Sequence, residues 1–432
     1  MIYFPNGYIE KILSADIVGI VNLYVPNVRQ VDGQLFAAEC PFCSGSTRTM
    51  LLERDTGKWY CLACGEGGNV ISFVMKAFSV SFESAVAWIA QVCGIEVPQS
   101  VADLATERSR VRERLLKANR CAATFYWHGL RLEKSGEAMS YLTDRGVALE
   151  YANLFGLGYA DRSSNSLRDH LRKNGFTDEE IVVSGLCCKS DSGKIYDRFR
   201  DRIMFPIMDD GNRVIAFGGR ILHPVKNKDG KDVPKYLNTP DTPIFDKGST
   251  LYGMNRASKF AFDHLIVCEG YMDVLSMHQA GFPNAVAGLG TALTDRNADV
   301  IASRTKTALL CYDMDDAGRN ALERAATKLS ERGVRMFVPD FRPAKDPDEF
   351  LKKEGRDAFV QRLGNATPLA IYEAERLASN EPNVKEVAEI ALKYGWDVDP
   401  AAIASVAGIS VETLMRATRL LRMDAILGEP LR

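Results

Sequence analysis

Short apolar segments that end in acidic residues recur in the second half of the chain, and they constrain its fold more than any other feature. Three such segments occur, each followed by carboxylates: residues 264–268 by Glu269 and Asp273, residues 307–312 by Asp313 and Asp315, and residues 334–338 by Asp346 and Asp348. Apolar runs of four to eight residues that alternate with longer amphipathic segments are typical of buried parallel strands joined by helices. We therefore expect a parallel sheet, with helices at residues 272–280, 295–303 and 318–332.

The carboxyl ends of parallel strands meet at one edge of a sheet, so these acids should lie close together. Carboxylates at one edge repel each other unless cations keep them ionised. Oxygen ligands suit Mg²⁺ or Mn²⁺, which support phosphoryl chemistry by activating a hydroxyl and stabilising a leaving oxygen. A single Asp-x-Asp is more often a solvated loop or a helix cap, and we expect Asp316 to be the N-cap of the helix that follows.

Four cysteines in the first part of the chain have the spacing of a zinc site. Cys40 and Cys43 form one Cys-x-x-Cys pair, Cys61 and Cys64 form another, and seventeen residues lie between the pairs. Two such pairs fit a tetrahedral Cys₄ site with no position open for a substrate water, which predicts structural zinc. Residues 49–53 and 58–60 should form the hairpin between the pairs, with the turn at residues 55–57.

Three aromatic residues beside the cysteines could stack on single-stranded bases: Phe36, Trp59 and Tyr60. Residues of this kind are more often part of a hairpin core, so both interpretations stay open.

Basic residues gather between the two regions. Residues 101–260 contain 27 Lys and Arg against 21 Asp and Glu, although the whole chain has 54 against 56. Arg198, Arg200 and Arg202 alternate just before an apolar run, and this alternation should place them on one face of an extended segment. Gly218 and Gly219 precede Arg220, and glycines beside an arginine would let the backbone approach a phosphate. Together these residues predict a groove for nucleic acid.

The motifs resemble those of a known family. Glu-Gly-Tyr-Met-Asp at 269–273, Tyr-Asp-Met-Asp-Asp-Ala-Gly at 312–318 and Asp-Pro-Asp at 346–348 are similar to the Toprim signature. Tyr-Asp-Arg-Phe-Arg at 196–200, Phe-Gly-Gly-Arg at 217–220 and Pro-Lys-Tyr-Leu-Asn at 234–238 are similar to the basic region of DnaG-type bacterial primases. The chain departs from that family at Cys43, where a histidine is common, and at Met314 and Asp316.

The resemblance implies roles for individual residues. Glu269, Asp313 and Asp315 would be catalytic and would hold Mg²⁺ or Mn²⁺, with Asp273, Asp346 and Asp348 completing the acidic site. The residues that would contact nucleic acid or nucleotide are Arg145, Arg200, Arg202, Arg220, Lys235, Tyr236 and Lys247.

The expected fold is a multidomain α+β protein. We predict a zinc ribbon domain at residues 1–99, a linker with some helix at 100–120, the basic part of an RNA polymerase core at 121–261, a Toprim parallel-sheet subdomain at 262–350 and a helical subdomain at 351–432. Residues 361–432 read as all-helical, with helices at 369–378, 384–394, 401–407 and 411–421 joined by turns that contain Pro or Gly.

Composition restricts where the protein acts. The chain has no apolar run long enough to span a membrane and no signal-peptide pattern at its start, so we expect a cytoplasmic protein without membrane contact. Its ten cysteines then belong to a reducing compartment.

These features predict a DNA primase that makes short RNA primers on a single-stranded DNA template from ribonucleoside triphosphates. Family members usually continue into a helicase-binding domain, which this sequence lacks, so we expect no helicase binding through such a domain. The sequence is then a truncated form or a short natural one. Two alternatives stay open: a Toprim nuclease or topoisomerase, and a non-catalytic zinc-bearing module that binds single-stranded DNA.

Overall fold

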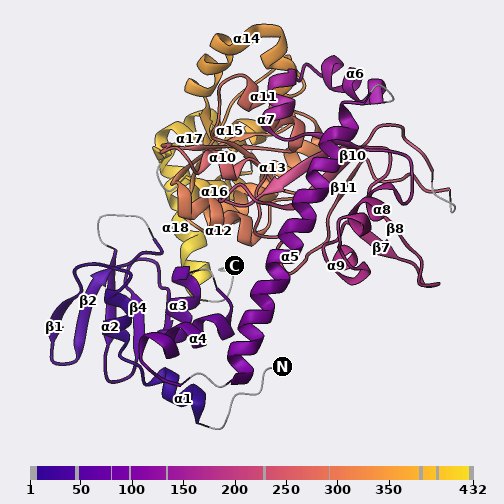
Figure 1. The fold of residues 1–432 in the computed structure, drawn as a ribbon. Helices are drawn as coiled ribbons and strands as arrows, with labels where there is room; N and C mark the ends of the chain where they lie inside the picture. Colours follow the sequence, from indigo (N-terminus) through magenta and orange to yellow (C-terminus); the bar gives the residue numbers. More distant parts are fainter. Residues whose placement is uncertain are drawn as a thin grey trace. The chain divides into compact units, whose positions relative to one another are not determined.

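The computed structural model describes nine ranges of the chain: residues 7–43, 48–78, 80–96, 99–132, 135–226, 230–290, 292–378, 383–395 and 398–427. The side chains of residues 99–106 and 424–427 lie outside this description. The chain divides into two compact units, Met1–Arg114 and Leu115–Arg432 (Figure 1).

The first unit is built on a five-stranded antiparallel sheet whose strands follow each other in sequence order. Its strands are β1 (Arg29–Asp32), β2 (Leu35–Glu39), β3 (Thr49–Glu53), β4 (Lys58–Cys61) and β5 (Gly67–Asn69). The predicted hairpin is confirmed, because Glu53 pairs with Lys58 across the turn and Gly57 has the left-handed φ of 63° that this turn requires.

Four helices provide the core of this unit: α1 (Tyr8–Leu13), α2 (Ile17–Asn22), α3 (Val70–Phe78) and α4 (Phe82–Val92). Ile12, Phe73 and Ile89 are fully buried against Met50 and Trp59 of the sheet. In the described part of the chain no single helix combines the length and apolar character of a membrane span; α3 and α4 pass that test only as a pair bent by 109°.

Residues 100–120 lie within one long helix, α5 (Gln99–Leu130), which is continuous across the boundary between the units (Figure 1). Ala118, Ala122 and Tyr126 on this helix are buried in the core of the second unit. The C-terminal half of α5 is therefore part of a packed domain.

After α5, the second unit continues with short helices and a four-stranded antiparallel sheet. The strand order of this sheet is β11-β10-β9-β6. The strands are β6 (Gly158–Ala160), β9 (Arg202–Met208), β10 (Val214–Ile221) and β11 (Tyr236–Asn238), and a separate pair is formed by β7 (Cys187–Lys189) and β8 (Ile195–Asp197). The helices are α6 (Gly136–Asp144), α7 (Leu149–Leu154), α8 (Ser166–Lys173) and α9 (Asp178–Val183).

The predicted parallel sheet follows, in the order β13-β12-β14-β15-β16. Its parallel strands are β12 (Leu265–Cys268), β13 (Ala285–Ala287), β14 (Thr307–Cys311) and β15 (Arg335–Val338), and its helices are α10 (Met254–Ala257), α11 (Tyr271–Gln279), α12 (Asp295–Arg304) and α13 (Asp316–Ser330). The three predicted helices match α11, α12 and α13 within two residues at each end.

Both faces of this sheet are covered. Helix α11 and α14 (Pro347–Gly364) pack on one face, together with the inner side of β9. Helices α12 and α13 pack on the other. The shared core with β9 fixes the basic sheet next to the parallel sheet, which brings the two halves of the predicted site together.

The last part of the chain differs from expectation at one point. It forms α15 (Leu369–Ala378), α16 (Val384–Tyr394), α17 (Pro400–Val406) and α18 (Val411–Leu427), as predicted. Residues 361–432 are not helical throughout, however, because Thr367 and Pro368 form β16, which pairs antiparallel with Phe337 and Val338 of β15. An exposed sheet edge outweighs helix propensity here, since it offers unpaired backbone groups.

Candidate metal centre and nucleic-acid interface

The four predicted zinc ligands converge. Cys40 and Cys43 follow β2, Cys61 ends β4 and Cys64 lies in the turn after it. The Sγ atoms of Cys40 and Cys64 lie 4.0 Å apart and those of Cys43 and Cys61 lie 3.7 Å apart, and all four lie within 4.8 Å of one another. A tetrahedral zinc ion with Zn–S bonds of about 2.3 Å separates its sulfurs by about 3.8 Å, so the cysteines fit structural zinc.

Backbone geometry prepares one of these thiols for ionisation. Burial disfavours the Cys61 thiolate, but N–H groups of Cys64 and Ala63 outweigh it and lower the pKa of Cys61 to about 7. Burial raises the pKa of Cys43 to about 11. Four neighbouring thiolates need a cation before all can ionise, which zinc would provide.

The acidic residues lie at the carboxyl ends of the strands, as predicted. Glu269 follows β12 directly, and Asp313 comes two residues after β14. The Glu269 carboxylate is close enough to Asp313 to raise the pKa of the Asp313 carboxyl, and the nearby backbone N–H of Asp313 favours the charged form of Glu269. Glu269 Oε2 is buried without a hydrogen-bond partner among the described residues. A buried carboxylate oxygen of this kind is where a cation would be stabilised.

Burial and mutual repulsion make these acids hard to ionise. Burial, followed by repulsion from Asp313 and Asp348, raises the pKa of Asp273 to about 7. Burial, followed by repulsion from Glu269 and Asp346, raises the pKa of Asp313 to about 6. Burial also raises the pKa of Glu269. Together these shifts indicate a concentration of negative charge that a divalent cation would relieve.

Two of the acids also cap helices, and one cap differs from the prediction. The N-cap of α13 is Asp315, whose Oδ1 accepts the N–H of Gly318 at 2.8 Å; Asp316 is the first residue inside the helix. Asp346 caps α14 by accepting the N–H of Glu349 at 2.7 Å. Each cap uses one carboxylate oxygen, so capping is compatible with metal binding through the other.

Asp348 has two protein partners. It accepts hydrogen bonds from the Ser276 hydroxyl and the Lys352 ammonium. Within the described part of the chain the four cysteines are the one group of three or more ligands that meets at metal-binding distance, so the acids form a charged neighbourhood rather than a closed ligand set.

Two of the predicted basic residues belong to the antiparallel sheet: Arg220 lies on β10, and Lys235 comes just before β11. Arg220, only 8% exposed, donates to the Tyr236 hydroxyl at 2.8 Å, and its guanidinium lies over the Tyr141 ring at 5.0 Å. Burial, with Arg220 and Arg145 nearby, lowers the pKa of Lys235, and the carboxylates of Asp313 and Asp273 oppose this. Lys235 is therefore within electrostatic reach of both the arginines and the acids.

The predicted common face of Arg198, Arg200 and Arg202 is wrong. Asp201 adopts a left-handed φ of 52°, which breaks the extended segment between β8 and β9. The Arg202 guanidinium is buried and donates to the carbonyl of Gly219 at 2.8 Å and that of Pro234 at 3.0 Å, so Arg202 is a structural residue. Arg200 is exposed and stays a candidate for nucleic-acid contact.

The glycines before Arg220 serve packing. A Cβ on Gly218 would lie 2.5 Å from the Tyr271 hydroxyl oxygen, and one on Gly219 would lie 2.8 Å from Phe199 and 3.0 Å from Arg202. The expectation that these glycines admit a phosphate is therefore wrong.

The remaining predicted residues differ in their exposure to solvent. Arg145 and Lys247 are exposed, and the Lys247 ammonium lies 3.4 Å from where a Cβ on Gly290 would be. Trp59 is buried, with its ring N–H on the carbonyl of Asn69 at 3.2 Å, so it belongs to the hairpin core. Tyr60 is 50% exposed and Phe36 is covered by Arg54, which leaves Tyr60 as the exposed aromatic of the three.

The sequence interpretation missed residues that join the two sheets. The Tyr271 hydroxyl donates to Asn238 Oδ1 at 2.8 Å, and Asn238 Nδ2 donates to the carbonyl of Leu289. The Tyr271 ring stacks on Phe205 at 4.9 Å. Tyr271 lies within the family motif at 269–273 and Asn238 within that at 234–238. Membership in these motifs was the only feature of the sequence that pointed to them.

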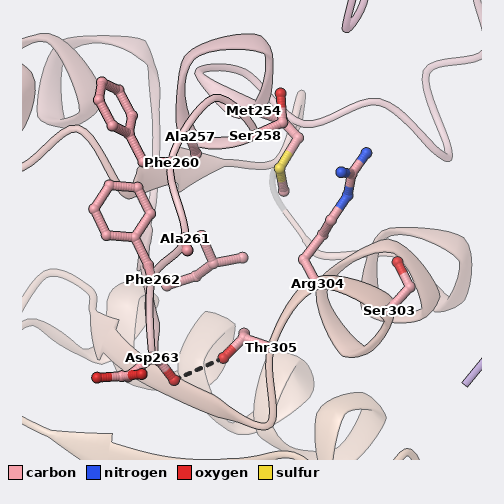
Figure 2. A pocket seen from close by; sticks show the side chains of 11 residues that line it. Met254, Ala257, Ser258, Phe260, Ala261, Phe262, Asp263, Ser303, Arg304 and Thr305 are labelled. Carbon is pink, nitrogen blue, oxygen red and sulfur yellow. Dashed lines mark hydrogen bonds between the residues drawn. The ribbon is translucent and has the colours of Figure 1, made fainter. Parts of the chain in front are cut away.

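A pocket of about 340 Å³ lies at the opposite edge of the parallel sheet (Figure 2). It is lined by residues that include Leu265 at the start of β12 and Thr305 just before β14. The rings of Phe260 and Phe262 lie 5.7 Å apart on one side, and Arg304 projects from the other. It is separate from the acidic edge.

Comparison with known proteins gives matches along most of the chain. Family models match as a CHC2 zinc finger at residues 5–104, as the N-terminal domain of a DNA primase catalytic core at 125–258 and as Toprim-like at 266–351. The DNA primase of Clostridium acetobutylicum is 36% identical over 384 residues, and that of Pseudomonas putida is 38% identical over 386. The chain belongs to the DnaG-type bacterial DNA primase family.

Solved structures of primases agree with this assignment. The zinc-binding and RNA polymerase domains of the Aquifex aeolicus primase match 95% of the chain and 99% of that structure at 28% identity, with a TM-score of 0.60. A primase domain of Pseudomonas aeruginosa matches 71% of the chain and 99% of that structure at 35% identity, with a TM-score of 0.61. A third match, over 70% of the chain and 99% of that structure at 30% identity with a TM-score of 0.57, is a DnaG primase catalytic domain bound to single-stranded DNA.

The extent of the matches is uneven. The C. acetobutylicum primase is matched over 89% of this chain but 62% of its own length, and the P. putida primase over 86% and 57%. This primase-family chain thus spans about three fifths of its full-length relatives. It also carries Cys43 within a zinc finger of the type named for a Cys-His-Cys₂ set, and the geometry places Cys43 with the other three sulfurs.

Proposed function

We propose that this chain is a template-directed RNA polymerase that synthesises short RNA primers on single-stranded DNA from ribonucleoside triphosphates. The observation that carries this proposal is the juxtaposition of two charge systems in one packed unit. Glu269, Asp273 and Asp313 have pKa values raised by burial and by neighbouring carboxylates. Lys235 is close enough to Asp273 and Asp313, and to the arginines at 145 and 220, for all four charges to shift its pKa.

The acids are suited to divalent cations. Glu269 has a buried oxygen without a protein partner among the described residues, and Asp315 keeps one oxygen outside its helix cap. We infer that Glu269, Asp313 and Asp315 hold Mg²⁺ or Mn²⁺, with Asp273, Asp346 and Asp348 setting the surrounding charge. When bound, such ions would lower the pKa of an attacking 3′-hydroxyl and neutralise the triphosphate.

The chain's own cations would place the substrates. Arg220 is held rigidly by Tyr236 and Tyr141, which preorganises its guanidinium for a phosphate. Lys235 and Lys247 present ammonium groups beside the acids and beside the turn at Gly290, where a triphosphate would bind. Arg145 and Arg200 are exposed and suited to template phosphates. A solved relative bound to single-stranded DNA supports this choice of template.

The proposal is tested by incorporation of labelled ribonucleotides on a single-stranded template, with and without Mg²⁺. Wild-type protein should make short RNA only with the metal. Asp313→Asn should reduce synthesis by at least about a hundredfold, because preorganised charge stabilisation of this kind typically contributes that much, while its urea unfolding stays cooperative.

Other outcomes would overturn the proposal. Nicking or relaxation of supercoiled DNA without RNA synthesis would indicate a Toprim nuclease or topoisomerase. Template binding that ignores Mg²⁺, with no labelled product, would indicate a binding module.

A further inference from the structure

The segment that carries Arg145 is fastened to helix α11 by one side chain. Gln279, the last residue of α11, accepts the N–H of Ala148 through Oε1 at 2.8 Å and donates from Nε2 to the carbonyl of Gly146 at 2.8 Å. These two bonds bracket Val147, so the amide is satisfied at both ends by the backbone of a segment more than 130 positions away in sequence.

Two further contacts restrict the same segment. Val147 is 8% exposed and belongs to the core that contains the parallel sheet. Gly146 adopts a φ of 74°, and a Cβ there would lie 3.1 Å from Cε of Lys352. Lys352 in turn pairs with Asp348. The backbone just after Arg145 is therefore held on three sides, whereas the Arg145 side chain itself is exposed.

Helix α11 connects this bracket to the acids. Its first turn carries Asp273, which accepts the N–H of Gly270 at 2.9 Å, and Glu269 comes two residues before the helix. The helix is nine residues long, so at 1.5 Å per residue Gln279 lies roughly 12 Å along the axis from its first residue, Tyr271. A rigid helix thus has the metal-site acids at one end and the Arg145 segment at the other.

The Arg145 side chain lies near the other predicted basic residues. Its guanidinium lies 5.6 Å from the centre of the Tyr141 ring, the same ring that packs against Arg220. Arg145 is also close enough to Lys235 to lower its pKa, after burial and Arg220. An arginine on a loose loop would lose entropy on meeting a phosphate, and a bracketed backbone removes part of that cost.

We propose that Gln279 is a positioning residue for template binding: its amide holds the Gly146–Ala148 backbone so that Arg145 meets a template phosphate at a fixed distance from the acids. This inference rests on the proposed function, because it takes Arg145 as a template contact.

The test is a double-mutant cycle on template affinity. Arg145→Ala, Gln279→Ala and the double variant are titrated with a fluorescent single-stranded oligonucleotide at several salt concentrations, and primer synthesis is measured against template concentration. Each single variant should weaken binding roughly fivefold and reduce the salt slope by about 0.7, the value for one lost phosphate contact on a single strand. The double variant should be no weaker than Arg145→Ala, because Gln279 acts through that residue.

Kinetics separate positioning from general damage. The KM for template should rise in Gln279→Ala while kcat at saturating template stays within about twofold, as expected when ground-state and transition-state binding are lost equally. Gln279→Glu is the second variant: it keeps the acceptor for Ala148 but lacks the donor for Gly146, so it should give an intermediate loss. Gln361→Ala, at an exposed glutamine on α14, is the matched control and should match wild type.

The outcomes are distinct. Additive losses in the double variant, or an unchanged salt slope in Gln279→Ala, would refute the positioning role. If Gln279→Ala unfolds at lower urea than wild type, the Gln279→Glu cycle with Arg145→Ala decides by the same criterion. If wild-type protein neither binds the oligonucleotide nor makes RNA, the proposed function fails instead.

Discussion

Tyr271 occupies the space that any side chain at position 218 would need. A Cβ on Gly218 would lie 2.5 Å from the Tyr271 hydroxyl oxygen and 2.8 Å from Cε2 of its ring. The contact joins β10 of the basic sheet to the first residue of α11, directly beside the acidic edge. The close packing of β10 against α11 therefore requires glycine at position 218. This packing sets the distance between the basic sheet and the acidic residues.

Gly218→Ala should push the two sheets apart. Forcing one methyl into a packed core costs typically about 1–3 kcal/mol, so we expect the free energy of unfolding, measured with urea, to fall by that amount. The rate of primer synthesis should fall by a larger factor than the folded fraction of the protein, because the basic residues move relative to the acidic ones. Gly136→Ala is the control, since a Cβ there has no atom of the described residues within 4 Å. Equal stability of Gly218→Ala and Gly136→Ala would contradict this account.

Replacing Arg202 should affect the stability of the fold, whereas replacing Arg200 should affect template binding. Arg202→Ala removes the guanidinium donor from the carbonyls of Gly219 and Pro234, and we expect a loss of about 2 kcal/mol or more, because each unsatisfied buried acceptor costs about 1–3 kcal/mol. Arg200→Ala should leave the urea midpoint unchanged and weaken template binding with a smaller salt slope. The reverse pattern would show that Arg202 binds template after all.

His278 predicts a pH dependence of stability. Burial is the main cause that lowers the pKa of this residue from 6.5 to about 4, and its Nε2 bonds the carbonyl of Ala285 at 2.9 Å. Because the folded pKa lies below the unfolded one, the unfolded state takes up the proton first. Stability should be fully present above pH 6.5 and decline as the pH falls toward 4, by about 3 kcal/mol in total for this group.

Comparison of wild type with His278→Gln isolates this contribution. The difference in free energy of unfolding between the two proteins, measured at several pH values from 7.5 to 4.5, should change in favour of the variant as the pH falls. A difference independent of pH would mean that the pKa of His278 is the same in the folded and the unfolded protein.

The zinc site gives a prediction about the first unit. Cys61→Ser should lose zinc, measured by metal analysis. It should also red-shift the fluorescence of Trp59, which lies on β4 with Cys61 and is 3% exposed in the core of the first unit. Binding free energy of about 10–16 kcal/mol for structural zinc makes metal loss equivalent to unfolding of such a module. Cys43→His should retain one zinc per chain, since histidine is also a zinc ligand. Full zinc content in Cys61→Ser would exclude the four-cysteine site.

The sequence carried enough information for the parts of the fold that depend on periodicity. The buried strands at β12 and β14 and the zinc hairpin follow from apolar runs and from cysteine spacing, which are local patterns. Contacts between distant segments left no such pattern. Nothing in the alternation of Arg198 and Arg202 showed that Asp201 would turn left-handed and bury Arg202, and the bracket from Gln279 to Gly146 joins residues 133 positions apart.

The position of the cap on α13 shows the same limit at short range. Asp315 and Asp316 are adjacent and chemically identical, so propensity alone could not decide which one caps the helix. The decision comes from Gly318, where a Cβ would collide with the backbone of Asp313, so the helix can begin only where this approach is possible.

The two-residue strand β16 has a consequence for how the protein behaves among other molecules. It covers the outer side of β15, and at the far side of the sheet β13 is met by the backbone of Tyr252. Neither border of the parallel sheet then offers a long row of free amides and carbonyls to a neighbouring polypeptide. The hydrophobic sheet, which carries the acidic residues at the carboxyl ends of its strands, is in this way protected along its flanks from adding strands of another chain.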